Sequence, residues 1–65
     1  MSKIFYTIME GKKFLNNNFL RDMNENIIES IMFSSLEGAE QYFEDLRKDR
    51  GFRIVKVICE LEDIG

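Results

Sequence analysis

The sequence predicts a small α+β protein with the element order β-β-β-α-β, in which one amphipathic helix packs on one face of an antiparallel sheet of three to four strands. Four segments are rich in β-branched and aromatic residues and are separated by Gly, Asn or Ser. Another segment repeats apolar residues every three or four positions, as an amphipathic helix does. The 65 residues form a single domain, 1–65, and a lone chain of this size hides only about 60% of its surface.

The first two strands are expected over residues 2–9 and 12–15. The first run is rich in Ile, Phe, Tyr and Thr and ends at a Glu-Gly pair that is typical of a turn. Gly11 permits the positive φ that tight hairpin turns require, so the two strands are expected to pair. The three Asn residues at 16–18 mark the next turn, because Asn tolerates the left-handed region and bonds to its own backbone.

The segment that follows has a less regular pattern. Residues 19–20 either resume the second strand beyond a bulge or anchor a loop. Residues 21–26 are polar without periodicity and are expected to form a loop. The apolar run at 27–33 is predicted to be the third strand, although a short helix that begins near Met23 fits the same run.

The clearest local signal is a capping box at residues 34–37, Ser-Ser-Leu-Glu, which predicts a helix with Ser34 as its N-cap. The helix is expected to extend for about 15 residues and to end at Gly51, a left-handed terminator. The apolar stripe that would pack on the sheet consists of Leu36, Ala39, Tyr42, Phe43 and Leu46.

Residues 52–61 are predicted to be the last strand, followed by an acidic end at 62–65. Both alternating faces of this strand are apolar in its middle, which is typical of a central strand covered on both sides.

A single helix covers one face of a sheet, so the second apolar face is expected to need a partner. The sequence therefore predicts a homodimer, by sheet stacking or by pairing of edge strands across a two-fold axis, or a docking face for another protein. The candidate partner-binding residues, four apolar and three acidic, are Phe5, Met9, Val55, Val57, Glu37, Glu40 and Glu44.

The net charge of −3 argues against a general nucleic-acid-binding protein, but the charge is segregated along the chain. Residues 22–46 contain seven acidic and no basic residues, whereas residues 47–56 contain five basic residues and one acidic residue. Two alternatives follow: a small RNA- or DNA-binding protein, or an acidic mimic of nucleic acid that uses the 22–46 block. The candidate phosphate-contacting residues are Lys12, Lys13, Arg47, Lys48, Arg50 and Arg53.

The residue types present argue against an enzyme. The chain has no His and a single Cys, Cys59, so the common nucleophilic triads and zinc sites cannot be assembled, and its glycines form no phosphate-binding loop. No catalytic, metal or cofactor site is therefore expected. A lone thiol and the absence of a long apolar run favour a cytoplasmic protein that does not enter a membrane.

Residues 33–43 (FSSLEGAEQYF) followed by 52–57 (FRIVKV) resemble the strand-"SLEEAE"-helix-strand pattern of small bacteriophage proteins of the host-takeover and anti-defence type. The bias towards Lys, Asn, Ile and Phe, without Pro, Trp or His, is similar to that of proteins from AT-rich phage genomes. The resemblance covers about 25 residues and implies an inhibitor that acts by stoichiometric binding to a host protein in the host cytoplasm. It identifies no functional residues.

Overall fold

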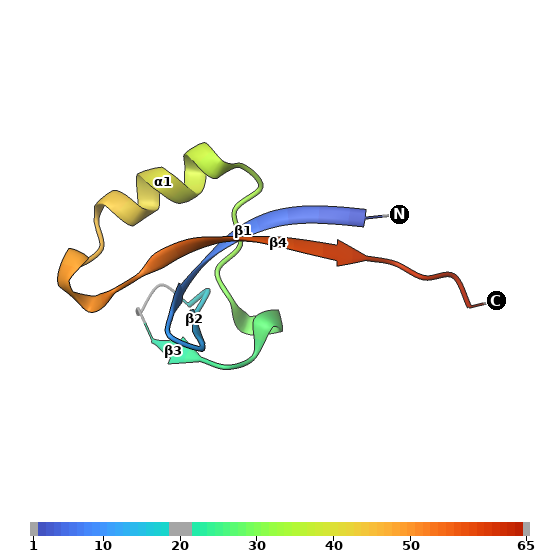
Figure 1. Cartoon of the computed structure of the whole chain (residues 1–65), viewed down its shortest axis with the longest axis horizontal. Coiled ribbons are helices and arrows are strands. Elements are labelled where there is room, and N and C mark those ends of the chain that lie inside the picture. The colour runs from blue at the N-terminus through green and yellow to red at the C-terminus, as the bar shows by residue number, and fades with distance from the viewer. Residues whose placement is uncertain (1, 19–21, 65) are drawn as a thin grey trace.

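The computed structural model describes residues 2–18 and 22–64. Its open antiparallel sheet of four strands carries one α-helix, α1 (Leu36–Glu44), which confirms the predicted α+β class (Figure 1). The sheet order is β3-β2-β1-β4. The remaining elements are the strands β1 (Ser2–Glu10), β2 (Lys13–Leu15), β3 (Met23–Asn24) and β4 (Arg53–Glu60) and the 3-10 helices η1 (Ile27–Glu29) and η2 (Lys48–Arg50).

The central element is β1, which pairs with β4 along nearly its whole length. Eight residue pairs join the two strands, from Ser2 opposite Glu60 to Met9 opposite Arg53. On its other edge β1 forms the predicted hairpin with β2, and Gly11 in the turn has the positive φ of 60° that the sequence led us to expect.

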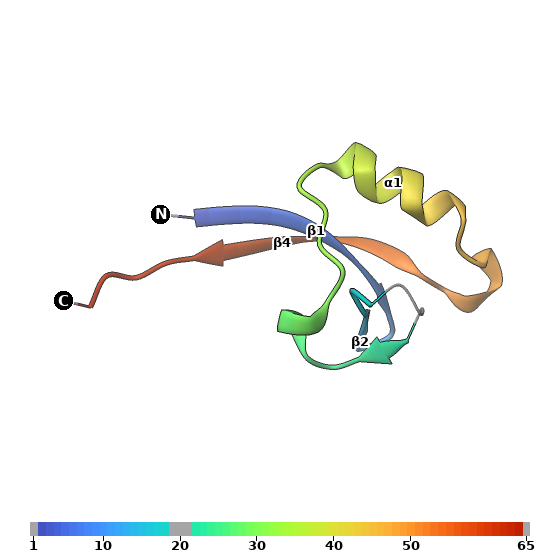
Figure 2. The ribbon, with the colours of Figure 1, turned by 180° about the vertical axis from the view of Figure 1, so that it is seen from behind.

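The hydrophobic core lies between α1 and one face of the sheet. Its buried centre consists of Ile8, Leu15, Ile31 and Leu46. Tyr42 and Phe43 of the helix segment pack against this centre, so α1 covers the Ile8 face of β1. Figures 1 and 2 show α1 on one side of β1 and β4, and β3 with η1 on the other side.

Residues 30–33 cross from the end of β2 to the middle of β1. Ser30 pairs with Asn16, and Phe33 exchanges both backbone hydrogen bonds with Tyr6, at N···O distances of 2.8 and 2.9 Å. The hairpin therefore opens beyond its first pairs, and this segment satisfies the backbone of β1 where β2 has diverged from it.

The prediction of a third strand at 27–33 is wrong. These residues form η1 and then two isolated bridges, because the Asn26 side chain accepts the Ile28 N–H at 3.0 Å and stabilises a tight turn instead of a ladder. The third strand is β3, a two-residue strand inside the predicted loop 21–26. The expectation for residues 19–20 lies outside the described residues.

The helix begins one residue later and ends earlier than predicted. Ser35, not Ser34, is the N-cap, and its hydroxyl accepts the Gly38 N–H at 3.1 Å. The last turn tightens through a bond from Leu46 N–H to the carbonyl of residue 43. The chain then continues into η2, which ends at Gly51 with φ of 78°.

Two expectations about the sheet are also wrong. The predicted central strand, β4, lies at the edge of the described sheet, where β1 is its one neighbour among residues 2–18 and 22–64. The sheet face opposite α1 is not open at its centre, because Phe5 and Thr7 point to that face and are 7% and 0% exposed. Apolar residues on both faces of a strand indicate cover on both faces, but they carry no information about its two edges.

Two buried hydroxyl groups provide a test of the packing. Thr7 Oγ1 has no hydrogen-bond partner among the described residues, whereas Ser30 Oγ donates to the Ile27 carbonyl at 2.7 Å. We expect Thr7→Val to raise the free energy of unfolding by about 1 kcal/mol, because it removes an unsatisfied hydroxyl, and Ser30→Ala to lower it by about 1 kcal/mol. Urea titration followed by circular dichroism measures both changes, and a loss of stability in Thr7→Val would contradict this account.

Candidate interaction surface

The β1–β4 pair projects beyond the part of the sheet that α1 covers. The molecule measures 46 × 23 × 19 Å, and in Figures 1 and 2 the long axis follows these two strands past the start of the helix. We call residues 2–4 and 58–61 the projecting ribbon; its pairs are Ser2 with Glu60, Lys3 with Cys59 and Ile4 with Ile58.

Apolar side chains are exposed on the projecting ribbon. Ile4 and Ile58 lie directly opposite each other and are 46% and 61% exposed. Leu61, the next residue after β4, is 67% exposed. Because Ile4 lies two and four residues before Tyr6 and Ile8, it points to the same face as the helix, but the cover of α1 does not extend to it.

The outer edge of β4 has no strand beside it in the described part of the chain. Tyr6 directs its backbone N–H and C=O to Phe33, away from β4, so the neighbouring Phe5 and Thr7 direct theirs to β4. Phe5 and Thr7 face Val57 and Val55, and the alternate residues of β4 therefore point their backbone groups outwards. We call these outward groups the β4 edge; they belong to Ile54, Lys56, Ile58 and Glu60.

The structure separates the candidate partner-binding residues. Phe5 is buried and offers little surface to a partner. Met9, Val55 and Val57 are half-buried on the face opposite the helix, because they share the alternation of Phe5. The three acidic candidates, Glu37, Glu40 and Glu44, are exposed on α1, on the other side of the sheet.

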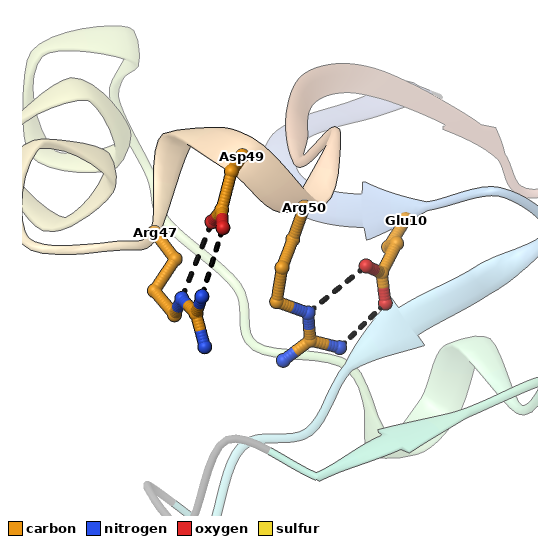
Figure 3. Close-up of polar contacts among 4 residues, drawn as sticks. All are labelled: Glu10, Arg47, Asp49 and Arg50. Atoms are coloured by element: carbon orange, nitrogen blue, oxygen red, sulfur yellow. Dashed lines mark hydrogen bonds and ion pairs between the residues drawn. The ribbon is translucent and has the colours of Figure 1, made fainter.

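The basic candidates are largely engaged within the chain. Arg50 forms a bidentate ion pair with Glu10 at 2.6 and 3.0 Å, and Arg47 contacts Asp49 at 2.8 Å (Figure 3). The hydrogen bond to Glu10, together with the nearby charges of Glu10 and Asp49, raises the pKa of Arg50 above its ordinary value. The positive charges of Arg47 and Arg50 are therefore already paired with carboxylates of the same chain.

The two remaining basic residues of the 47–53 segment bind backbone carbonyls. Lys48 Nζ donates to the Phe43 carbonyl at 2.7 Å, at the end of α1, and lies 4.1 Å from the centre of the Phe43 ring. Arg53 donates to the Gly11 carbonyl at 2.9 Å and so ties β4 to the hairpin turn. Lys12 and Lys13 follow that glycine and are exposed at the tip of the turn.

The acidic block at 22–46 does not form one surface. Its first part includes β3 and η1, and its second part includes α1, which Figures 1 and 2 place on opposite sides of the β1–β4 pair. A mimic of nucleic acid needs its charges along one face, so this arrangement gives that alternative no support.

Sequence reasoning missed the residues that make the β4 edge distinctive. Ile4, Ile58 and Glu60 were not among the candidate contact residues, and Lys56 was considered only as a member of the basic cluster 47–56. The alternation of Lys56, Ile58 and Glu60 is visible in the sequence, but its significance depends on β4 being an edge strand, which local pattern does not reveal.

Residues 2–18 and 22–64 contain no pocket and no group of three His, Cys, Asp or Glu residues that could hold a metal ion. They also contain no helix of the length and apolar character needed to cross a membrane. Cys59 is a free, half-buried thiol.

Because most of the basic candidates bind groups within the chain, we predict that the protein does not bind nucleic acid. We expect no retention of a labelled single-stranded RNA or DNA at about 0.15 M salt in a gel-shift assay, because four of the six candidate contacts already bind groups of the chain itself. Retention that is abolished by Lys12→Glu with Lys13→Glu would show instead that the hairpin tip binds phosphate.

Comparison of the chain with protein-family models, with curated proteins and with solved structures found no match. The function of the chain has therefore to be inferred from its own residues and their arrangement.

Proposed function

We propose that this chain is a small non-enzymatic interaction module that acts by stoichiometric binding to another protein, as a homodimer. The observation that carries the proposal is the projecting ribbon, where exposed apolar side chains lie beside the unpaired β4 edge. An edge strand with free backbone groups is a template for pairing with another chain, and natural proteins usually shield such an edge.

The energetics of the ribbon favour association. Full burial of one Ile side chain stabilises a complex by about 1.5–3 kcal/mol, and Ile58 and Leu61 each leave more than half of their surface available for it. In addition, a strand paired on the β4 edge satisfies its backbone groups with the regular geometry of a sheet. These contributions are specific to binding and require no reactive group.

The amino-acid composition favours a binding function over a catalytic one. A chain without His and with one half-buried Cys lacks the side chains that most often act as nucleophile or general base near neutral pH. The resemblance of residues 33–57 to small phage proteins favours a host protein as the target, so we propose that a phage encodes the chain and that it inhibits a bacterial defence protein.

Substitution of an exposed isoleucine tests this function. We expect Ile58→Asp to abolish recovery of a stoichiometric partner when the tagged protein is incubated with bacterial lysate, because a carboxylate in the exposed apolar pair of the ribbon would be desolvated in the complex. Ile28→Asp is the matched control, since Ile28 is 77% exposed on η1, away from the ribbon, and the same change there should leave recovery unchanged.

Circular dichroism should show that both variants remain folded, because both side chains are exposed. Equal recovery of the partner with Ile58→Asp and with the original protein would contradict the use of the ribbon. The absence of any stoichiometric partner would contradict the proposed function as a whole.

A further inference from the structure

We propose that the β4 edge binds the β4 edge of a second copy, antiparallel about a two-fold axis at Ile58, so that two four-stranded sheets become one. The inference deepens the homodimer named in the proposed function and rests on it only in taking the ribbon as a surface for association. A second copy is selected as the occupant because the side chains along β4 complement themselves in one register.

The outward backbone groups restrict how two β4 strands can pair. Lys56, Ile58 and Glu60 direct their N–H and C=O groups to the edge, and in an antiparallel ladder such residues must face one another. The allowed registers therefore differ in steps of two residues, because a step of one residue would exchange the faces of the sheet.

Charge selects one register. With the axis at Ile58, Lys56 faces Glu60 of the second copy, and symmetry repeats this pair. With the axis at Val57, Lys56 faces Ile58. With the axis at Cys59, Glu60 faces Ile58, and Lys56 meets an opposite charge only in Glu62, beyond the end of β4. With the axis at Lys56 or at Glu60, like charges face each other across the axis. Directly opposed charges of opposite sign stabilise a sheet and like charges destabilise it, so the axis at Ile58 is favoured.

The same register groups the apolar side chains. Ile58 faces Ile58 of the second copy, and the neighbouring Ile4 residues extend this contact into a row of four isoleucines across the central strands. On the opposite face Val57 meets Cys59 of the second copy, and Val55 meets Leu61. The register that pairs Lys56 with Glu60 therefore also brings the exposed apolar side chains of the two ribbons into contact.

The dimer would also enlarge the surface that is offered to a third protein. A two-fold axis perpendicular to the sheet leaves both copies of α1 on the same face. Each helix covers the end of β4 that is remote from Ile58, as Figure 1 shows for one copy. The row of isoleucines would therefore lie between two helices, and a protein bound there would contact both copies.

Charge reversal tests the pairing without any partner protein. We expect light scattering after size exclusion to give twice the chain mass of 7.7 kDa for the original protein, with a dissociation constant raised about tenfold or more by Lys56→Glu or by Glu60→Lys alone. An equimolar mixture of the two variants should dimerise, and so should the double variant, because each restores two opposed pairs. Lys12→Glu, at the hairpin tip, is the control for net charge.

If mixing restores the dimer, each single variant is correctly folded, and its loss of dimerisation is due to the like charges. A monomer at all concentrations, or a dimer insensitive to the reversals, would overturn the inference. Binding of a bacterial protein that still depends on Ile58 would then support stoichiometric binding through the ribbon, with that protein and not a second copy on the β4 edge. A dimer that responds to the reversals but captures no bacterial protein would support the pairing of the β4 edges and contradict the proposed binding function.

A cysteine cross-link tests the register. Val57 and Cys59 of the second copy form a non-hydrogen-bonded pair in this arrangement, with Cα atoms about 4.5 Å apart, which a disulfide can span. We expect Val57→Cys to give a covalent dimer on mild oxidation and Val57→Cys with Cys59→Ser to give none. A cross-link in the second variant would place the axis at Val57 and overturn the proposed register.

Discussion

The antiparallel pairing of β1 with β4 holds this molecule together. It joins the first described residues to the last strand through eight residue pairs, and α1 packs on the surface that these two strands create. The ion pair between Arg50 and Glu10 and the bond from Arg53 to Gly11 strengthen the same junction near the hairpin turn. β2, β3 and the crossing segment then add to the free side of β1.

The size of the helix sets the limit of this architecture. α1 has nine residues and β1 has nine, but a helix rises about 1.5 Å per residue and a strand about 3.3 Å, so the helix spans less than half the length of the strand. One end of the β1–β4 pair is consequently left without cover. The exposure of Ile4 and Ile58 follows from this mismatch of lengths and not from an isolated apolar residue on the surface.

The features that could be predicted from the sequence are those with a local cause. The first hairpin, most of the apolar stripe and the positive φ of Gly51 each depend on residues close to one another in the chain, and they occur as expected. The helix is shorter than predicted, and Leu36, the first residue of the predicted stripe, is 45% exposed and not packed on the sheet. β3 could not be predicted, because two residues have no periodicity. The edge position of β4 could not be predicted either, since the order of strands depends on contacts between distant segments. Without it, the sequence gives no reason to single out Lys56 and Glu60, whose backbone groups point outwards from that edge.

The register of β1 and β4 has a consequence for the order of folding. Met9 pairs with Arg53 and Ser2 with Glu60, so the main pairing waits for β4, which is synthesised roughly 2–12 s after β1 at bacterial and eukaryotic rates of elongation. During that time β1 can pair with β2 and, at Tyr6, with the crossing segment 30–33. Local hairpins form in microseconds, and this one would occupy one edge of β1 while the other edge waits for β4. The early hairpin and the crossing segment therefore fix one edge of β1, at Met9, Glu10 and Tyr6, before the other edge meets β4.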